Sequence, residues 1–442
     1  MLSAINQELH ARPYVRLPGQ AQVLHLSFAH DRAAPGTSGE SPATLVQAFA
    51  MRATYEASRH AIYASDLPGV GHLVLAWACH TGYTSFTLYL YGLKEALRPA
   101  TPFSYDMVGL LPEGWLAARR GALLSALHLC LLPHLPAPEG AEPHAAYFDL
   151  RSLTGSSVMA GAGTVWTDFR LDEAGFSKML LETRGMSRHE VGRTVQRLLG
   201  VEDMHHLVLM PLAVARETKA SSDDDELRIA EVMRAISRAA TTEEKRARLD
   251  ELMALAVVVE RDSTHLALHL APAHAYYAML LQAFKELRED KLPGVLSIST
   301  FVLRRVAPAV QTYTYLERRF EALSARLARA ADLLRTAVEL NVSEQNQLLL
   351  GRMDERAKLQ LRLQETVEGL SIIAISYYTV GLLGYVFKGA KALGWHVQSD
   401  VAIALSVPVV VVSIWLGGRY LRHQLLGRGT DVSPAETDPR ET

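Results

Sequence analysis

Residues 367–387 read VEGLSIIAISYYTVGLLGYVF, and residues 401–418 read VAIALSVPVVVVSIWLGG. Neither run carries a charged residue after Glu368. Because a helix rises about 1.5 Å per residue, each run would be roughly 26 to 30 Å long as a helix, which is the thickness of the hydrocarbon core of a bilayer. The two runs therefore predict a transmembrane hairpin over residues 366–420, with a short polar turn between the spans.

The charge pattern predicts how this hairpin is oriented. The amino-terminal residues contain no apolar segment typical of a secretory signal, so we expect the preceding domain to stay in the cytoplasm. Basic residues are more frequent outside the spans than in the turn, which by the positive-inside rule places both termini in the cytoplasm. The flanking basic residues are Arg352, Arg356, Lys358, Arg362, Arg419, Arg422 and Arg428, against Lys388 and Lys391 in the turn.

Composition narrows the classes of function. The 442 residues are enough for two or three domains. A net charge of −2 argues against a nucleic-acid-binding protein, which would need a basic face. Cys79 and Cys130 are too few for a disulfide framework, and neither belongs to a CxxC pair for metal or redox chemistry. We predict no bound cofactor.

The sequence divides into four segments. Residues 1–215 mix strand and helix patterns and predict a cytoplasmic α/β or α+β domain. Residues 216–365 are charged and helix-prone and end in a long stalk helix, residues 366–420 form the hairpin, and residues 421–442 are expected to be a disordered cytoplasmic tail. Within the first domain we predict strands at 22–28, 72–91 (a hairpin), 147–150 and 157–171, and helices at 41–64, 115–132, 175–181 and 187–199.

Two serines match the pattern of helix N-caps. Ser187 is followed three residues later by Glu190, which is a capping-box pattern. Ser221 precedes three aspartates, and acidic residues are favourable near a helix start.

A heptad pattern runs through the predicted stalk. Apolar residues at alternating spacings of four and three indicate a coiled-coil seam of about three heptads. Its members are Leu316, Phe320, Leu323, Leu327, Ala330, Leu334 and Ala337. We expect the stalk helix to run into the first span without a break, and the seam to pair with other copies in a homo-oligomer.

The first span is more polar than the second. Its hydroxyl and small residues are typical of helix–helix contact in membranes, or alternatively of a water-filled path in an oligomer. These candidates are Ser371, Ser376, Tyr377, Tyr378, Thr379, Gly381 and Gly384. The second span is aliphatic and is interpreted as lipid-facing, with a mild kink at Pro408.

Other candidate sites give weaker signals. His10 and Arg12 form a polar cluster that suits an anion or a protein partner, although a surface arm is the simpler explanation. His265 and His269 would share a helix face as metal ligands do, but no HExxH glutamate accompanies them. The adjacent His205 and His206 should point to different sides of a regular element. We therefore predict no metal site.

Several stretches resemble a bacterial family of predicted membrane-anchored proteins of unknown function. They are NQELHARPY at 6–14, LAWACHTGYTSFTLY at 75–89, and residues 164–180, 192–213 and 356–385. This resemblance covers nearly the whole chain and implies the bacterial inner membrane as the location.

The order of segments also resembles the CorA class of divalent-cation channels, which place a long helix and a short carboxyl-terminal hairpin after a cytoplasmic domain. That class ends its first span with Gly-Met-Asn. Here residues 384–389 read GYVFKG, with Lys388 at the expected mouth, which argues against magnesium transport of the CorA type.

The sequence contains no GxSxG motif and no carboxylate pair with a spacing that indicates acid–base catalysis, so we predict a protein that is not an enzyme. We expect a homo-oligomeric protein in the membrane that conducts or senses ions or solutes. The alternative is a membrane-tethered scaffold or regulator whose cytoplasmic domain binds a soluble partner.

Overall fold

The computed structural model describes residues 14–30, 41–94, 101–135, 144, 146–239, 241–392 and 399–426. The chain forms two compact units, Met1–Leu334 and Arg335–Thr442. The first contains a ten-stranded mixed sheet and a helical bundle, and the second contains helices only among its described residues. This confirms the predicted combination of strands and helices followed by a long helical region.

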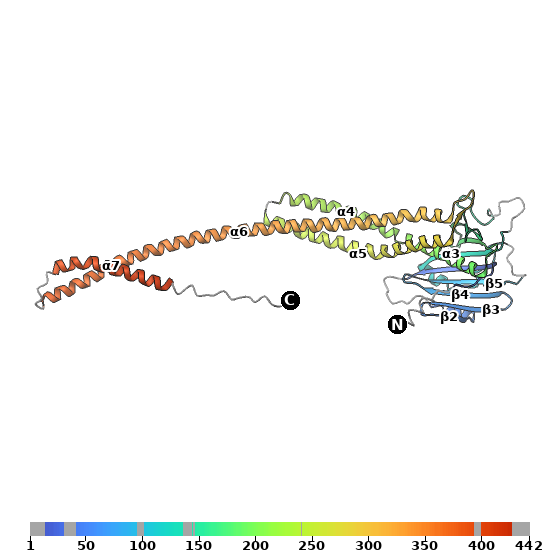
Figure 1. Cartoon of the computed structure of the whole chain (residues 1–442), viewed down its shortest axis with the longest axis horizontal. Coiled ribbons are helices and arrows are strands. Elements are labelled where there is room, and N and C mark those ends of the chain that lie inside the picture. The colour runs from blue at the N-terminus through green and yellow to red at the C-terminus, as the bar shows by residue number, and fades with distance from the viewer. Residues whose placement is uncertain are drawn as a thin grey trace. The chain divides into compact units, whose positions relative to one another are not determined.

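The sheet has the strand order β10-β7-β8-β9-β6-β1-β5-β4-β3-β2 (Figure 1). Neighbouring strands are antiparallel except for β6 and β9, which are parallel. The strands are β1 (Ala21–Ala29), β2 (Arg52–Glu56), β3 (His60–Leu67), β4 (Gly71–Cys79), β5 (Tyr83–Tyr91), β6 (Leu123–Leu132), β7 (Thr154–Val158), β8 (Gly163–Leu171), β9 (Ser177–Glu182) and β10 (Asp290–Lys291).

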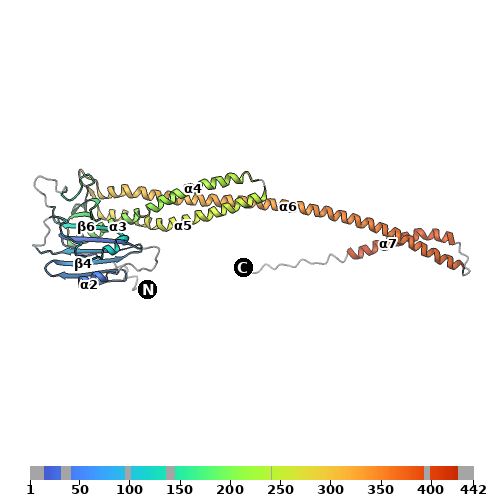
Figure 2. The same ribbon diagram turned by 180° about the vertical axis from the view of Figure 1, so that it is seen from behind.

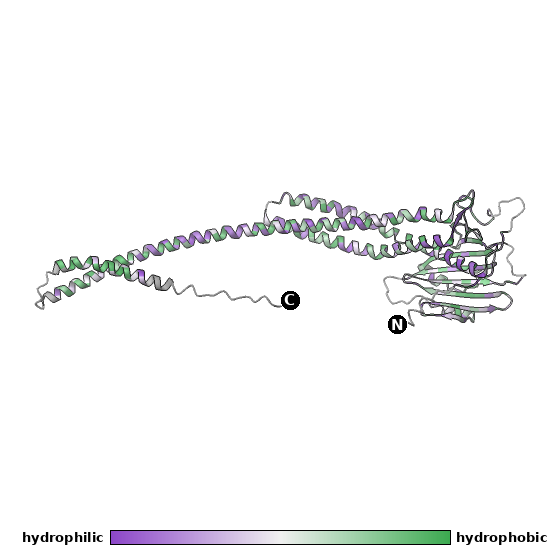
Figure 3. Cartoon of the chain, in the orientation of Figure 1, coloured by the Kyte–Doolittle hydropathy of each residue, from purple (hydrophilic) through white to green (hydrophobic). Residues whose placement is uncertain are grey.

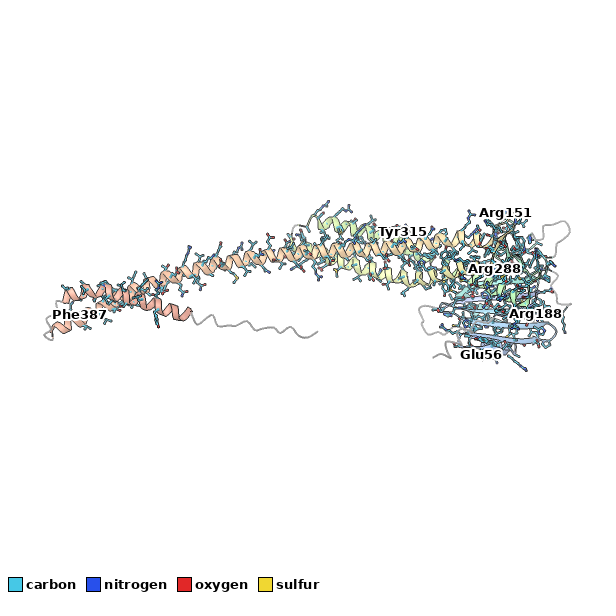
Figure 4. The ribbon with its side chains drawn as sticks, viewed as in Figure 1. Glu56, Arg151, Arg188, Arg288, Tyr315 and Phe387 are labelled. Atoms are coloured by element: carbon cyan, nitrogen blue, oxygen red, sulfur yellow. The ribbon has the colours of Figure 1, made fainter. Side chains whose placement is uncertain are left out.

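The helices are concentrated in the second half of the chain. They are α2 (Ala43–Ala48), the short 3₁₀ helix η2 (Ala117–Ala122), α3 (Arg188–Leu209), α4 (Leu212–Ile236), α5 (Thr242–Leu287), α6 (Ile298–Ala392) and α7 (Ser399–Leu426). Helix α6 is continuous over 95 residues, which confirms the prediction of a stalk helix that runs into the first apolar run without a break. Helix α5 ends at Arg288, whose φ of 46° lies in the left-handed region (Figure 4).

Both faces of the sheet are covered by apolar side chains. On one face α3, the end of α5 and the start of α6 pack on the strands through Val195, Leu280 and Val302. On the other face α2 and the segment 101–116 pack through Leu45 and Trp115. Strands such as β1, with eight of nine residues buried, therefore lack a polar face.

Helices α4 and α5 lie alongside the first part of α6 in both views of the chain (Figures 1 and 2). Six of the seven residues of the predicted seam are buried between them, and the last, Ala337, is half-buried. Leu316, Phe320, Leu323, Leu327, Ala330 and Leu334 are each at most 5% exposed and belong to one cluster with residues of α4 and α5. The seam is therefore filled within its own chain, whereas we had expected other copies to fill it.

Several elements of the first domain differ from the prediction. The helix expected over 41–64 is the short α2 followed by β2 and β3, and the helices expected over 115–132 and 175–181 are mainly β6 and β9. Strand β6 has the sequence LLSALHLCLL, and such an uncharged run in a strand buried on both faces has no alternation to distinguish it from a helix. Residues 147–150 form turns and a bend, not a strand.

The strands expected at 22–28 and 72–91 are confirmed as β1 and the β4–β5 hairpin, and the segment 157–171 contains the end of β7 and all of β8. The cap at Ser187 is confirmed, because both hydrogen bonds of a capping box link it to Glu190. Ser221 is not a cap. It lies inside α4, where its hydroxyl donates to the carbonyl of Thr218 at 3.0 Å.

The second unit consists of the remainder of α6 and of α7. Figure 3 shows the end of α6 and most of α7 coloured as hydrophobic, whereas the preceding part of α6 is largely hydrophilic. Helix α7 continues to Leu426, so the start of the segment that we expected to be disordered, residues 421–442, is helical. The rest of that segment lies outside the described residues.

Candidate functional site

Three helical stretches are long and apolar enough to cross a membrane. In the first, Arg188–Ile236, 56% of the most apolar window is buried inside the protein, so the core of the first unit accounts for its composition. The other two, Ile298–Gly389 and Ile403–Tyr420, have 6% and 0% of their windows buried. These two match the predicted spans, and other described residues bury almost none of their most apolar windows.

The end of α6 packs against α7 through one face. A side chain added at Gly384 would meet the Ile403 side chain of α7 at 3.5 Å, which fixes the direction of this face. The buried or half-buried residues of the span recur at spacings of three and four and so lie on that face. They are Ile372, Ser376, Thr379, Val380, Leu383, Gly384 and Phe387, the last of which Figure 4 labels.

The opposite face of the same span carries a second set of small and hydroxyl residues. At 100° per residue these residues lie about 180° from the side that packs on α7. We call this set the open stripe, and it consists of Ser371, Ala374, Tyr378, Gly381 and Tyr385, all of them exposed. Tyr378 is 71% exposed, and nothing lies within 4 Å of a side chain added at Gly381.

Six of the seven predicted residues are therefore divided between the two faces, and the seventh, Tyr377, lies between them. Ser376, Thr379 and Gly384 lie toward α7, and Ser371, Tyr378 and Gly381 belong to the open stripe. Tyr377 is 76% exposed but points to the side, about 100° from the direction of Ser376.

Backbone carbonyls satisfy part of the polarity of this span. The hydroxyl of Ser371 donates to the carbonyl of Val367 at 2.8 Å, and that of Thr379 donates to Ile375 at 2.7 Å. The Ser376 hydroxyl is buried and has no hydrogen-bond partner among the described residues. A hydroxyl that bonds to its own helix can face either lipid or a neighbouring helix. The presence of these hydroxyls therefore does not identify the neighbour of the span, whereas the face on which they lie does.

The first unit contains a cavity of about 220 Å³ between the sheet and α3. Its lining includes Tyr14, His25, Thr87, Gln196 and Asp203. Polar groups at the centre of a sheet face are expensive to bury unless they are hydrogen-bonded, so this lining requires an internal network.

That network centres on the carboxylate of Asp203 in α3. One of its oxygens, Oδ1, accepts hydrogen bonds from Ser27 at 2.6 Å and Ser125 at 2.9 Å, and it lies 3.0 Å from His25 Nε2. The other ring nitrogen of His25, Nδ1, lies 2.8 Å from the hydroxyl of Thr87. Four segments far apart in the sequence are thus joined at one buried point.

Burial by itself would raise the pKa of the Asp203 carboxyl. The charge of His25, its hydrogen bond and the hydrogen bonds of Ser27 and Ser125 lower this pKa below its ordinary value. The carboxylate is therefore ionised at neutral pH and holds His25 in position. Such a carboxylate–imidazole pair beside a cavity can orient a polar ligand or accept a proton from it. Sequence patterns do not show this site, because its two main residues are 178 positions apart.

The remaining candidates fall in different places. His10 and Arg12 lie outside the described residues. His265 and His269 share a face of α5 with ring centroids 4.7 Å apart, and no described group completes a metal site with them. The expectation that His205 and His206 diverge is wrong, because their ring centroids lie 4.0 Å apart.

Comparison with known proteins identifies a family. The family described as "Protein of unknown function (DUF3422)" matches residues 3–425. The chain belongs to the DUF3422 family. No curated protein and no solved structure matches it. The match covers both units of this DUF3422 protein, from before β1 to nearly the end of α7.

Proposed function

We propose that this DUF3422 protein is an integral protein of the bacterial inner membrane that assembles as a homo-oligomer and conducts or senses ions or solutes in a CorA-like manner. In this assembly α6 and α7 cross the bilayer as a hairpin, both termini are cytoplasmic, and the ends of α6 from several copies surround a common axis. The observation that carries the proposal is the open stripe on the face of α6 opposite α7.

The open stripe supports an assembly for a physical reason. Small residues in a membrane helix allow close approach of a second helix, and hydroxyl groups are more favourable beside protein or water than beside lipid tails. Helix α7 already covers the other polar face of the span. The open stripe therefore has its natural partner in another copy of α6 or in water along an axis that several copies share.

The charge near the expected mouth limits which ions suit such a path. Lys388 follows the span, and Gly-Met-Asn is absent from residues 384–389. A lysine near a narrow opening disfavours a divalent cation by like-charge repulsion. We therefore do not assign magnesium as the transported ion.

The cavity of the first unit favours a second candidate function. Here the hairpin is only a tether, and the first unit is a regulator that binds a soluble partner. A cavity of about 220 Å³ with an ionised Asp203 and a hydrogen-bonded His25 suits a small polar molecule better than a macromolecule. This candidate requires no path through the membrane.

Two adjacent tyrosines provide a test of the first proposal. The full chain is reconstituted into liposomes, and fluxes of Na⁺, K⁺, Mg²⁺ and Cl⁻ are measured for the original protein, Tyr378→Leu and Tyr377→Leu. Both phenols are exposed to a similar extent, but only Tyr378 belongs to the open stripe. We expect Tyr378→Leu to change the flux of the conducted ion several-fold and Tyr377→Leu to leave it nearly unchanged.

The mass of the detergent-extracted protein, measured by light scattering, completes the test. A monomer without flux of any of the four ions contradicts the proposal and favours the tether. In that case replacement of residues 366–420 by an unrelated two-span hairpin should leave the cellular activity of the protein intact.

A further inference from the structure

One turn of α3 brings three metal-ligating side chains together. Glu202, His205 and His206 are spaced i, i+3 and i+4 along the helix, and these spacings place side chains on one face. One possible ligand atom from each of the three lies within 4.8 Å of the other two. Among the described residues no other group of three histidine, cysteine or acidic side chains meets this condition.

Glu202 is an incompletely satisfied buried carboxylate. Its side chain is 2% exposed, and its Oε1 accepts a hydrogen bond from the Ser177 hydroxyl at 2.7 Å. Its Oε2 is buried without a hydrogen-bond partner among the described residues, and it lies 3.9 Å from the Nδ1 of His205, which is too far for a hydrogen bond. A buried carboxylate is costly unless a positive charge lies close to it, so this oxygen is a favourable ligand for a cation.

The two histidines present a free lone pair each. The Nδ1 of His205 lies 3.0 Å from the carbonyl of Val201, and the Nδ1 of His206 lies 2.8 Å from the carbonyl of Glu202. A carbonyl only accepts, so each Nδ1 must carry the proton, and each neutral ring keeps an unprotonated Nε2. An imidazole with Nδ1–H on a backbone carbonyl is the arrangement typical of a metal-ligating histidine.

Aromatic side chains border the cluster. The β8–β9 pairing is irregular between Thr167 and Leu171, and within that irregularity Phe169 has a φ of 53°. Its ring meets His205 edge-on at 5.9 Å and stacks on Phe301 at 4.8 Å. An apolar wall beside neutral ligands restricts water and strengthens the attraction between a cation and Glu202.

We propose that Glu202, His205 and His206 form a binding site for one divalent transition-metal ion, of which Zn²⁺ fits the donor set best. Two imidazole nitrogens and one carboxylate oxygen favour Zn²⁺ and its neighbours over Mg²⁺ and Ca²⁺, which prefer sets of oxygen ligands. Ligand atoms about 2.1 Å from a tetrahedral ion are roughly 3.4 Å apart. The three side chains must therefore rotate to bring each Nε2 and a carboxylate oxygen of Glu202 to that spacing, from an arrangement in which one ligand atom of each residue lies within 4.8 Å of the others. The fourth position is left for water or another ligand.

Metal binding to the whole chain tests this site. The detergent-solubilised protein is stripped with a chelator, and Zn²⁺ and Mg²⁺ binding are measured by titration calorimetry, with the bound metal counted by elemental analysis. We expect one Zn²⁺ per chain, no competition by millimolar Mg²⁺, and a loss of Zn²⁺ affinity of roughly tenfold or more in both Glu202→Gln and His206→Gln. The matched control is His269→Gln, which alters the other close histidine pair and should bind Zn²⁺ as the original protein does.

A spectroscopic measurement separates metal ligation from a structural role. Co²⁺ in a tetrahedral site with histidine ligands absorbs visible light, so the Co²⁺-loaded protein should show this band and His206→Gln should lack it while melting at an unchanged temperature. The proposal is overturned if the original protein binds no Zn²⁺ in a one-to-one ratio. It is equally overturned if Glu202→Gln and His206→Gln bind Zn²⁺ and give the Co²⁺ band as the original does.

Discussion

Helix α6 carries two periodic surfaces with different partners. The seam from Leu316 to Leu334 repeats apolar residues at spacings of four and three, and α4 and α5 of the same chain cover it. The open stripe from Ser371 to Tyr385 repeats small and hydroxyl residues at spacings of three and four, and no described residue of the chain covers it. The comparison shows that a periodic pattern of residues predicts that a helix face makes a contact. It does not identify the partner in that contact, which depends on the tertiary structure.

The largest expected effect is a loss of stability when a buried leucine of α6, but not an exposed one, is replaced by alanine. Leu327 is 2% exposed within the seam, whereas Leu333 is 72% exposed on the same helix. We expect Leu327→Ala to lower the free energy of unfolding of the first unit by about 2–5 kcal/mol, because it removes buried methyl groups and leaves a cavity. Leu333→Ala should change it by less than about 0.5 kcal/mol.

Thermal and urea unfolding of the full chain in detergent measures both changes. If the two alanine variants unfold alike, the seam is not packed inside its own chain. The seam would then be available to other copies, and the difference between the two surfaces of α6 would disappear.

The second prediction concerns the effect of acid pH on the stability of the first unit. His128 on β6 is half-buried, and its Nε2 is a buried atom that has no hydrogen-bond partner among the described residues. Burial, with the charge of Lys178, lowers its pKa from 6.5 to about 4. Between these values the unfolded chain takes up the proton and the folded chain does not, so stability falls as the pH falls from 6.5 toward 4, by about 3 kcal/mol in total.

His128→Leu should remove most of this fall in stability with pH. The control is His265→Leu, at an exposed position, which should show the same fall as the original protein. The measurement is the unfolding temperature of each variant at pH 7 and pH 4.5. Neither predicted span contains a histidine, so the oligomer mass in detergent should stay the same over this range. The prediction is contradicted if acid dissociates the oligomer and leaves the unfolding temperature unchanged.

The third prediction uses two glycines on opposite faces of the span. Gly384 lies against Ile403 of α7, whereas nothing lies within 4 Å of a side chain added at Gly381. Gly384→Leu should therefore disrupt the packing of the hairpin, at a cost of about 1–3 kcal/mol. Gly381→Leu should leave a single hairpin intact and weaken self-association instead.

Light scattering in detergent reports the oligomer mass, and the fluorescence of Trp415 in α7 reports the hairpin. We expect Gly381→Leu to lower the mass without altering the fluorescence, and Gly384→Leu to alter the fluorescence. Equal behaviour of the two variants would mean that the open stripe has no partner.

The sequence predicts the parts of this fold that local pattern determines. The apolar helices after residue 366, the continuous α6 and the β4–β5 hairpin follow from long runs, helix periodicity and β-branched or aromatic alternation. Strands β6 and β9 could not be predicted in the same way, because they pair in parallel between segments about 50 residues apart and their apolar runs suit either structure.

The candidate sites show the same limit. All seven small or hydroxyl candidates of the first span could be named from sequence, but the position of α7 was needed to assign six of them to two faces and to place Tyr377 on neither. The His25–Asp203 network depends on chain folding that brings β1 and α3 together. The proximity of His205 and His206 arises because each ring turns back to bond a carbonyl four residues earlier, which adjacent positions on a helix wheel do not suggest.

The smallest expected effect concerns two serines that share the N-cap sequence pattern but occupy different positions relative to their helices. Ser187 and Ser221 both match the N-cap pattern, but only Ser187 accepts a hydrogen bond from a free backbone amide, that of Glu190. Ser187→Ala should cost about 1 kcal/mol of stability, because that amide at the start of α3 loses its partner. Ser221→Ala should cost almost nothing or slightly stabilise α4, since its hydroxyl bonds to a carbonyl inside the helix and alanine is the better helix former. Urea unfolding of the two variants resolves a difference of this size, and an equal loss in both would show that α4 begins near Ser221 in solution.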